Sequence, residues 1–411
     1  MIGISQLYAG TATSADPIRY GRNSSRLPAH LHLLRFSQDR KPVVVWNCGR
    51  RCNLRCIHCY ADSRNERYAH ELTTAEAEAM IEDLSQFGVP VLLFSGGEPL
   101  MRRDMLRLAA FAAEKGIRPV ISTNGTLITR DKAEEIRAAG VAYVGVSIDG
   151  MRETNDHFRG LPGAFDLALR GIRNCVAAGQ KVGLRLTLTR HNVRDLPQIF
   201  ELIEREEIDR ACFYHLVYSG RGRGISDEDL THEETRAAVD YICEQTVGFH
   251  RRGIEKDILT VDNHADGVYV YLKLLQEEPE RAQDVLRLLR WNGGNRSGIG
   301  IGNIDNVGEV HPDQFWWSHS FGNVRQRPFS EIWSDLSDPL MAGLRDRKPL
   351  LTGRCGRCRY LDICNGNFRV RALAVHGDVW APDPACYLTD EEIGLDGSSA
   401  EGTVDEALRA R

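Results

Sequence analysis

The sequence has no hydrophobic run long enough to cross a membrane. Its apolar runs are far shorter than the roughly 20 residues of a membrane helix. The segment Met1 to Phe36 lacks the basic-then-apolar pattern of a secretory signal. The sequence also lacks an excess of either charge, since 52 basic and 57 acidic residues leave a net charge of −5. No global electrostatic field therefore favours binding to nucleic acid or to an acidic membrane. We expect a cytoplasmic protein with no nucleic-acid partner and no membrane span.

Cysteine is missing from most of the chain, and seven of the eleven cysteines fall in two tight groups. A disulfide framework would spread them along the chain, so this grouping indicates metal binding in a reducing compartment. The first group is Cys52, Cys56 and Cys59. Thiolates suit iron–sulfur clusters and zinc, but three are too few for a closed zinc site, and no fourth stands at finger-like spacing. A cubane cluster held by three thiolates keeps one iron open for a substrate or cosubstrate.

Two alternative explanations of this first group do not involve an iron–sulfur cluster. Three buried or incidental cysteines are improbable, because the thiols fall within eight residues of a largely cysteine-poor chain. A zinc site is the stronger rival, and it fails on the number of ligands.

From residue 43 onward, short apolar segments alternate with amphipathic ones. This pattern predicts parallel βα units with right-handed crossovers. The strand candidates are 43–47, 90–95, 118–122, 142–148, 182–189 and 210–216, with amphipathic stretches near 74–87, 104–115, 130–139, 164–178 and 194–206. Ligands bind at the carboxyl ends of parallel strands, and the cysteine loop follows the first strand.

Polar loops follow the later strands. Ser95–Pro99 follows the second strand, Ser122–Gly125 the third and Ser147–Gly150 the fourth, while Arg185 lies on the fifth. Two adjacent glycines allow close backbone approach, and the carboxylate of Glu98 beside them can accept from an ammonium group. Taken singly, each loop is equally explained as a turn or a helix cap. Their order behind the cysteine loop favours one shared site.

The stretch Cys52–Tyr60 resembles the cluster motif of the radical S-adenosylmethionine (SAM) enzymes, and Gly96–Pro99 resembles their GGEP motif. The resemblance implies an α/β fold, a partial (βα)6 radical SAM barrel. In that family the open iron of a [4Fe-4S] cluster chelates SAM, and one electron cleaves SAM to methionine and a deoxyadenosyl radical. Cys52, Cys56 and Cys59 would hold this cluster. The implied SAM contacts are Gly96, Gly97, Glu98, Pro99, Thr123, Asn124, Ser147, Asp149 and Arg185.

The second cysteine group resembles the auxiliary-cluster domain (SPASM or twitch type) of many radical SAM enzymes. Its members are Cys355, Cys358, Cys364 and Cys386. Four thiols complete a cluster, so we expect a closed second [4Fe-4S] centre that transfers electrons. The full SPASM pattern has further cysteines upstream, where Asn303 and Asp313 stand, so one auxiliary cluster is expected rather than two. A structural zinc ribbon is the alternative, which iron and sulfide content would separate.

The remaining cysteines are Cys48, an extra thiol of uncertain role, and the isolated Cys175, Cys212 and Cys243, which we expect in the core. The domain boundaries that we expect are an N-terminal strap over residues 1–40, the barrel over 41–224, a helical bridge over 225–295, the auxiliary-cluster domain over 296–393 and a disordered tail over 394–411. Amphipathic periods near 231–252 and 266–290 indicate long helices in the bridge. A β-hairpin around Asp305–Gly308 is expected at the start of the auxiliary domain.

Beyond these motifs, stretches such as His311–Trp317, Ser320–Val324 and Ala381–Cys386 resemble the radical SAM enzymes that edit siroheme-derived tetrapyrroles. The resemblance covers nearly the whole chain. It implies removal of two acetate side chains from didecarboxysiroheme to give Fe-coproporphyrin, or alternatively removal of propionates in heme d1 biosynthesis. It also implies an electron donor such as ferredoxin or flavodoxin.

Two further classes of protein are alternatives to a tetrapyrrole-modifying enzyme. SPASM-type domains are common in peptide-modifying enzymes, but residues 1–40 are too short and irregular for a leader-binding domain. A non-catalytic iron–sulfur carrier has no use for the GGEP loop.

A flat macrocycle with several carboxylates suits certain side chains of the sequence. Phe315, Trp316 and Trp317 could stack on its face, although burial in the core of the small domain explains the tryptophans equally well. The candidates for pairing with its carboxylates are Arg221, Arg223, Arg296 and His264. The polar cluster Asp262–Asp266 is either a helix cap or a substrate contact. No residue identifies a proton donor; His215 or Tyr214 is suggested by position alone.

Overall fold

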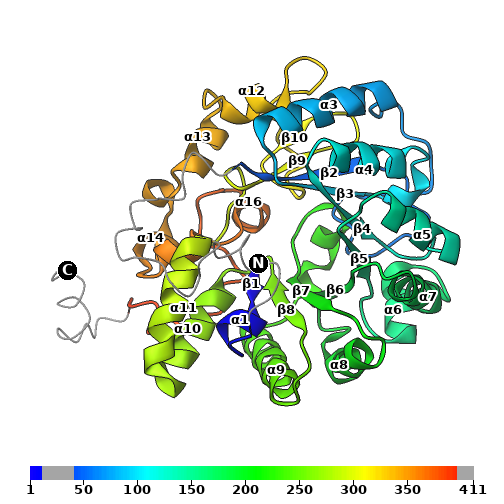
Figure 1. Cartoon of the computed structure of the whole chain (residues 1–411). Helices are drawn as coiled ribbons and strands as arrows, with labels where there is room; N and C mark the ends of the chain where they lie inside the picture. Colours follow the sequence, from blue (N-terminus) through cyan, green and yellow to red (C-terminus); the bar gives the residue numbers. More distant parts are fainter. Residues whose placement is uncertain (12–40, 396–411) are drawn as a thin grey trace.

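In the computed structural model, which describes residues 1–11 and 41–395, one curved sheet organises the chain (Figure 1). The strands of this sheet are β1 (Ile2–Gly3), β2 (Val43–Gly49), β3 (Val91–Gly96), β4 (Arg118–Thr123), β5 (Tyr143–Ser147), β6 (Val182–Leu188), β7 (Arg210–His215), β8 (Asp257–Val261), β9 (Ile301–Ile304) and β10 (Val310–His311). Their order is β1-β8-β7-β6-β5-β4-β3-β2-β9-β10. All pairs from β8 to β9 are parallel, and the edge strands β1 and β10 pair antiparallel.

Helices cover the outer face of this sheet and close its open side. The α-helices are α1 (Ile4–Leu7), α3 (Thr74–Phe87), α4 (Met105–Glu114), α5 (Arg130–Ala138), α6 (Arg152–Arg159), α7 (Ala164–Ala177), α8 (Leu196–Arg205), α9 (His232–Arg251), α10 (Ala265–Glu277), α11 (Pro279–Asn292), α12 (Phe329–Ser334), α13 (Pro339–Arg345), α14 (Gly353–Arg357), α15 (Leu361–Cys364) and α16 (Arg369–His376). In Figure 1, α3 to α9 follow the outside of the sheet, α12 lies beside α3, and α10, α11 and α13 to α16 lie on the side between the two edges of the sheet.

The 3-10 helices are short and lie between these elements. They are η2 (Pro99–Met101), η3 (Val193–Asp195), η4 (Gly220–Glu228) and η5 (Lys348–Leu350).

Helix α3 illustrates how local sequence fixes these elements. Thr73 caps its first turn by accepting from the Glu76 amide at 3.3 Å, and the Glu76 carboxylate accepts from the Thr73 amide at 2.8 Å. The helix ends at Gly88, whose φ of 86° terminates it in the left-handed conformation. Its buried stripe includes Met80 and Leu84, which belong to the main core. The helix predicted over 74–87 is therefore confirmed with the same bounds.

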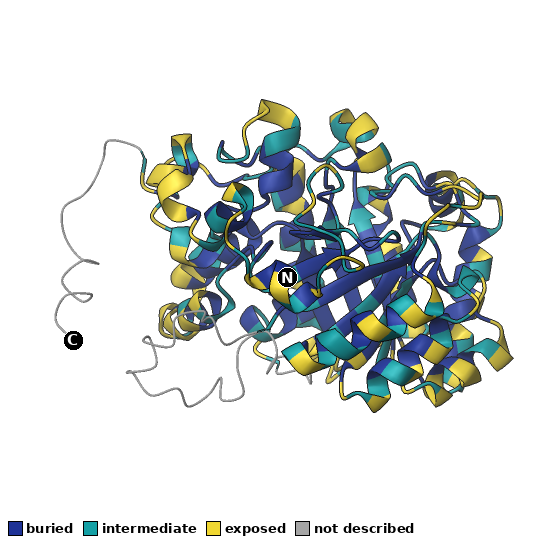
Figure 2. Ribbon diagram, turned by 90° about the horizontal axis from the view of Figure 1, so that it is seen from above, coloured by how far each residue is buried: buried dark blue, intermediate teal, exposed yellow. Residues whose placement is uncertain are grey.

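The six strands and five helices predicted from alternating patterns are all present. The parallel α/β architecture is confirmed, and the strand bounds differ from the predictions by at most two residues. Most strand residues are buried, as Figure 2 shows by dark blue strands beneath helices whose outer faces are yellow, but in β4 the half-buried Val120 and Ser122 alternate with buried residues. Trp46 and Phe94, on adjacent strands, are fully buried with ring centroids 5.5 Å apart.

The sheet extends beyond the six expected strands. Strand β8 lies within the segment 225–295 that was expected to be a helical bridge, and its five residues continue the parallel sheet next to β7. The periodicity near 266–290 is two helices rather than one, because Pro279 begins α11 directly after α10. A short strand flanked by long helices was hidden by their stronger pattern.

The hairpin expected around Asp305–Gly308 is present as β9 and β10, but it does not belong to a separate sheet. Strand β9 pairs in parallel with β2, with Val43 opposite Ile301 and Trp46 opposite Ile304. The start of the expected auxiliary-cluster domain is thus continuous with the barrel sheet.

The expected strap over residues 1–40 is described only in part. Residues 2–7 form β1, which pairs with β8, and the short helix α1, where an irregular strap was expected. Residues 12–40 of the strap, and residues 396–411 of the tail predicted over 394–411, lie outside the described residues. Within the described ranges, no helix combines the length and the apolar character that a bilayer span needs.

Candidate active site

The three cysteines of the first group line one cavity at the carboxyl ends of the parallel strands. Most of the loop residues predicted to bind SAM line the same cavity: Gly96, Gly97, Thr123, Asn124, Ser147, Asp149 and Arg185. They come from β3, β4, β5 and β6 and the loops that follow these strands, which are neighbours in the sheet. The sheet therefore collects residues from distant parts of the sequence at one edge, as expected for a parallel α/β fold.

The cysteine loop is held in place by backbone hydrogen bonds at both sides of Cys56. The Cys52 amide donates to the Arg64 carbonyl at 3.0 Å, and the Ile57 amide donates to the Phe158 carbonyl at 3.0 Å. All three thiols are free of disulfides. Burial raises the pKa of the Cys52 thiol to about 12 and also raises that of Cys56, with the neighbouring thiols adding to the effect.

Such thiols ionise only when a cation lies among them, which is what a cluster of iron ions provides. The loop also offers N–H groups to the sulfurs. The Leu54 amide donates to Cys52 Sγ at 3.4 Å, and an Arg159 guanidinium nitrogen donates to Cys56 Sγ at 3.5 Å. Hydrogen bonds of this kind stabilise cluster-bound thiolates. The donor set and its surroundings therefore fit a [4Fe-4S] cluster held by three thiolates.

The glycines after β3 are required by close backbone packing against the cysteine loop. The φ of Gly96 is 129°, and a Cβ there would lie 2.2 Å from the Gly49 carbonyl oxygen. A Cβ on Gly97 would lie 2.3 Å from the Arg51 carbonyl oxygen. In the native backbone the Gly97 amide donates to the Gly49 carbonyl at 2.8 Å. These contacts lock the two loops together.

Glu98 and Pro99 lie beside the cavity but do not line it. The Glu98 carboxylate is buried and accepts from Thr123 Oγ1 at 2.7 Å and from the Asn124 amide at 2.8 Å. Burial raises its pKa above the ordinary value. We expected this carboxylate to accept from an ammonium group, and this stays a prediction. In the structure the carboxylate orders the loop after β4, and the two glycines line the cavity.

Asp149 is fully buried and belongs to a charged network that reaches the cysteine loop. Its carboxylate forms an ion pair with Arg159, lies 3.4 Å from His58 Nε2, and accepts from the Thr187 amide at 2.8 Å. Burial lowers the pKa of His58 to about 4, against the attraction of Asp149. Sequence reasoning missed Arg159, because it ends α6, a short helix of eight residues in which Phe158 is the only apolar residue. His58 stands within the cysteine motif itself, so its position was visible in the sequence.

Arg185 faces the cavity from β6 and stacks on a neighbouring ring. Its guanidinium carbon lies 4.8 Å from the centroid of Tyr214 on β7. Ser147 on β5 is paired with Arg185 in the sheet register. Tyr60, the aromatic residue after the third cysteine, donates from its hydroxyl to Asn47 Oδ1 at 3.1 Å and lines the same cavity.

The second cysteine group is also gathered in space. Burial raises the pKa of the Cys364 thiol well above its ordinary value, and the nearby thiols of Cys386, Cys355 and Cys358 raise it further. Burial likewise raises the pKa of Cys386 to about 12. The Tyr360 amide donates to Cys358 Sγ at 3.4 Å. A fully thiol donor set with an N–H donor to sulfur fits a closed cluster.

Asn303 and Asp313 stand where the full SPASM pattern has further cysteines, and both side chains form hydrogen bonds within the protein. Asn303 donates to the Val45 carbonyl at 2.9 Å, and Asp313 accepts from the Phe315 amide at 2.8 Å and from Ser297. Across residues 1–11 and 41–395, no group of three or more His, Cys, Asp or Glu side chains is arranged to hold a single metal ion.

The other cysteines pack in the interior. Cys48 is buried and donates from its sulfur to the Ser95 carbonyl at 3.4 Å, so it joins β2 to β3 rather than facing the cavity. Cys175 and Cys243 belong to the main core, and Cys212 packs with Leu259 and Val261. These three thiols are core residues, as expected.

Of the three aromatic residues expected to stack on a macrocycle, only Phe315 lines the cavity. Trp316 is buried in a small apolar cluster, as the alternative interpretation held, and Trp317 packs near His311. Arg221 is not free to meet a carboxylate from outside, because it donates to the Cys56 carbonyl at 2.8 Å and to Asp62 at 2.7 Å. It braces the cysteine loop instead.

Of the remaining candidates for contact with the substrate, some line the cavity and others do not. Arg223 is exposed in η4 and Arg296 is half-buried; neither lines the cavity. His264 is buried with Nε2 3.4 Å from the amino terminus. His215 lines the cavity but is paired through Nε2 with Asp266 at 2.9 Å.

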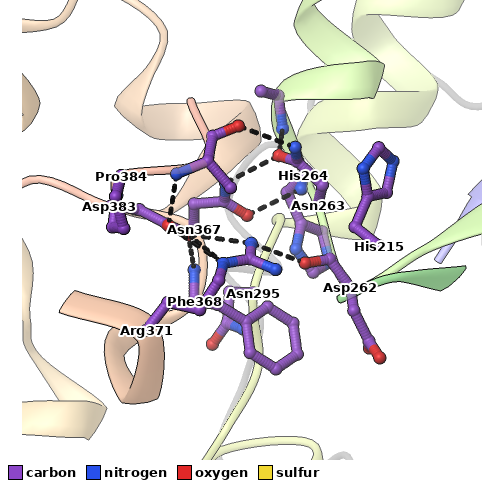
Figure 3. Close-up of polar contacts among 12 residues, drawn as sticks. His215, Asp262, Asn263, His264, Asn295, Asn367, Phe368, Arg371, Asp383 and Pro384 are labelled. Atoms are coloured by element: carbon purple, nitrogen blue, oxygen red, sulfur yellow. Dashed lines mark hydrogen bonds and ion pairs between the residues drawn. The ribbon is translucent and has the colours of Figure 1, made fainter. Parts of the chain in front are cut away.

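The polar cluster Asp262–Asp266 joins the barrel to the C-terminal segment (Figure 3). Asn263 donates to the Ala385 carbonyl at 2.9 Å, and the His264 amide donates to Asn367 Oδ1 at 2.7 Å. Ala385 directly precedes Cys386, and Asn367 follows Cys364 by three residues. The loop after β8 therefore positions the second cysteine group against the barrel. Asn263 also caps the start of α10 by accepting from the Ala265 amide at 3.1 Å, and Asp262 lines the cavity, where a substrate contact stays a prediction.

Comparison with known proteins gives consistent results. The family model of the radical SAM superfamily matches residues 46–203. The chain is 62% identical to Fe-coproporphyrin III synthase of Methanosarcina barkeri, over 96% of this chain and 99% of that protein. It is 46% identical to pre-heme d1 synthase of Dinoroseobacter shibae, over 86% and 88%. Among solved structures, Streptococcus suis SuiB bound to S-adenosylmethionine matches with a TM-score of 0.67 at 19% identity, over 85% of this chain and 78% of that chain.

Proposed function

The chain belongs to the radical SAM superfamily, and from this premise we propose that it removes the two acetate side chains of didecarboxysiroheme to give Fe-coproporphyrin. It is an enzyme, and the family implies a [4Fe-4S] cluster and SAM. The observation that supports this choice of substrate is the 62% identity to Fe-coproporphyrin III synthase over nearly the whole of both chains. Identity of that extent covers the cavity as well as the cluster loop.

We assign the first cluster to Cys52, Cys56 and Cys59. When bound there, the cluster and SAM would supply the radical chemistry that removes a hydrogen atom from the substrate. The chain's own contribution is positioning. The backbone at Gly96 and Gly97 allows close approach of the cofactor, and the Arg159 guanidinium stabilises the Cys56 thiolate.

The polar residues on the opposite side of the cavity would hold the rest of SAM. Asn124, Ser147 and Arg185 line it and carry donors suited to a carboxylate or a ribose. Asp149 is held by Arg159 and the Thr187 amide, so its contribution is to fix the geometry of these neighbours. The side chain of Glu98 orders the Thr123–Asn124 loop in the same way.

We assign a second, closed [4Fe-4S] cluster to Cys355, Cys358, Cys364 and Cys386. Their mutual proximity and the N–H donated to Cys358 support this assignment over four unrelated thiols. A closed cluster offers no iron to the substrate, so it serves electron transfer. The electrons would come from a reduced ferredoxin or flavodoxin.

The substrate would lie at the mouth of the cavity. Phe315 provides an apolar face and Arg185 a cation, which suit a flat ring with carboxylate side chains. The expected stacking by Trp316 and Trp317 is not retained in this proposal, because neither lines the cavity.

The test is anaerobic incubation of the reconstituted enzyme with didecarboxysiroheme, SAM and a reductant, followed by mass analysis. We expect loss of two acetate side chains and formation of deoxyadenosine. The matched control is Cys59→Ala, which should form neither product, whereas Cys175→Ala in the core should form both.

Removal of two propionates is the second candidate, favoured by the 46% identity to pre-heme d1 synthase. The same mass analysis separates the two, because the departing side chains differ by one methylene group each. An untouched macrocycle together with deoxyadenosine formation would contradict both reactions while leaving the radical chemistry in place. The likeness to SuiB, at 19% identity, supports the fold alone.

A further inference from the structure

Asp262 directly follows strand β8 and lines the cavity that holds the three cysteines. The residue is 7% exposed, and its φ of 66° lies in the left-handed region, which residues other than glycine enter at a cost. Two carboxylates line the cavity in the described part of the chain, Asp149 and Asp262. Asp149 is fully engaged in its network, whereas none of the described groups donates a hydrogen bond to the Asp262 carboxylate.

The backbone of Asp262 is held from the C-terminal segment, so this conformation is imposed by its surroundings. Arg371 on α16 donates to the Asp262 carbonyl at 2.7 Å and to the Leu216 carbonyl at 3.1 Å. Arg371 is itself held by Asp383 at 2.9 Å, and both side chains are completely buried. Figure 3 shows the Asp262 side chain extending away from this network, while its carbonyl receives the hydrogen bond. The clamp therefore directs the carboxylate into the cavity.

The charges that face Asp262 come from several elements. Arg371 on α16, Arg185 on β6 and the amino terminus of Met1 favour its ionised form, and Asp313 after β10 disfavours it. Tyr214 on β7 is the neighbouring titratable side chain, with its own pKa raised by burial. Burial is the largest influence on Asp262 and raises its pKa to about 6. Such a carboxyl exchanges its proton near neutral pH, which suits an acid catalyst.

The other titratable groups around the cavity are less suited to this task. His215 is paired with Asp266, and His58 is paired with Asp149 and is neutral above a pKa of about 4. The thiols of the cavity belong to the cluster loop.

We propose that Asp262 is the general acid that protonates the departing side-chain fragment. The inference rests on the proposed function. Loss of a hydrogen atom from the macrocycle and cleavage of the bond between the ring and the carboxymethyl group leave a new double bond in the ring and a carboxymethyl radical. One electron from a low-potential iron–sulfur or flavin carrier protein and the proton from the Asp262 Oδ–H bond convert that fragment to acetate. Solvent then reprotonates the Asp262 carboxylate.

The test compares Asp262→Asn with Asp262→Glu in the reconstituted full-length enzyme, with Asp257→Asn as control. Asp257 lies at the other end of β8, where it is paired with Arg210, so its variant removes a carboxylate from the same strand without touching the cavity. We expect Asp262→Asn to cleave SAM at the wild-type rate while releasing acetate about 100-fold more slowly, in the range for loss of a general acid. Asp262→Glu should recover acetate release in part, and Asp257→Asn should match the wild type.

Infrared difference spectroscopy provides a readout apart from turnover. The difference spectrum between the wild type and Asp262→Asn should contain a protonated carboxyl absorption that titrates near pH 6, and this band should be shifted in frequency in Asp262→Glu. The carboxyl of Asp313 titrates in the same range in both proteins, so it cancels in the difference. This measurement decides the case if Asp262→Asn folds poorly. Three results would overturn the inference. Asp262→Asn could release acetate at the wild-type rate, it could lose SAM cleavage and acetate release equally, or the titrating band could be absent. Failure of the proposed function is distinct, because the wild-type enzyme itself would then release no acetate.

Discussion

Arg159 donates a hydrogen bond to the sulfur of Cys56 across 3.5 Å. The same guanidinium forms an ion pair with Asp149, whose side chain is buried. One cation thus serves the cluster loop and the loop after β5 together. Because it is held between a thiol and a carboxylate in the interior, its removal affects both the stability of the fold and the electronic properties of the cluster.

Replacement of Arg159 by Met should destabilise the protein by about 3–5 kcal/mol, because it leaves the Asp149 charge buried without its partner. It should also lower the reduction potential of the first cluster, since a positive charge and a hydrogen bond to sulfur are lost. Anaerobic urea unfolding and a redox titration measure the two effects. Arg130→Met is the control: Arg130 lies 3.8 Å from Glu134, and the two side chains are 84% and 64% exposed, so a cost below about 1 kcal/mol is expected. A neutral Arg159→Met would contradict the role of the network.

Replacement of Gly97 by Ala should separate the two loops that frame the cavity. The added Cβ would meet the Arg51 carbonyl oxygen at 2.3 Å, and overpacking of this kind costs about 1–3 kcal/mol. We expect weaker SAM binding, measured by equilibrium dialysis. Gly248→Ala in α9 is the control, because nothing lies within 4 Å of its Cβ position, and it should gain stability. Unchanged SAM affinity in Gly97→Ala would show that the loops tolerate separation.

Replacement of Cys386 by Ala should remove the second cluster and spare the first. The iron content should fall from about eight to about four atoms per chain, since four thiolates are needed to hold a closed cluster. SAM cleavage should persist while turnover of the macrocycle falls. Iron and sulfide analysis provides the measurement, with Cys175→Ala as the core control. Zinc in place of iron at the second cysteine group would reject the cluster assignment.

Asp313 makes folding depend on pH in a defined direction. Burial raises the pKa of this carboxyl to about 6, above its value in the unfolded chain, so its stabilising contribution is complete below about pH 4 and is lost as the pH rises through about 6. Asp313→Asn lacks this titration. The stability of the variant relative to the wild type should therefore increase by about 3 kcal/mol between about pH 4 and about pH 8, a shift of about two pKa units.

Denaturant unfolding at several pH values measures this difference. Asp262 titrates in the same direction, so only the comparison of Asp313→Asn with the wild type isolates Asp313. A difference that stays constant with pH would contradict the assignment.

The strands of the barrel could be predicted because each is a short apolar run between turns and helices. The cysteine loop was equally visible, since its three thiols are local in sequence. Strand β8 could not be found in the same way, because Asp257–Val261 is short and lies between long amphipathic helices. The pairing of β9 with β2 depends on contacts between distant segments, which no local pattern reports.

The site was predictable to the same extent. The loop residues after β3, β4 and β5 were found from their order along the chain, but the direction of the Glu98 side chain was not, because it depends on the backbone of the next loop. Arg159 was missed as a functional residue, because its role depends on partners that only the folded chain brings near. Asp262 was noticed only as a member of the polar cluster Asp262–Asp266, because its position in the cavity depends on Arg371 from the C-terminal segment. The buried position of Trp316 likewise follows from packing rather than from its aromatic character.

The pairing of β9 with β2 has a consequence for biosynthesis. Asn303 and Val45, which are joined across these two strands, lie 258 residues apart in the chain. Contacts of such long range form late, since the intervening chain must first be closed into a loop. The strand that leads into the cysteine loop thus gains its second neighbour only after most of the polypeptide has left the ribosome. Iron–sulfur delivery before that moment would meet an unfinished sheet, so we expect maturation to follow translation rather than accompany it.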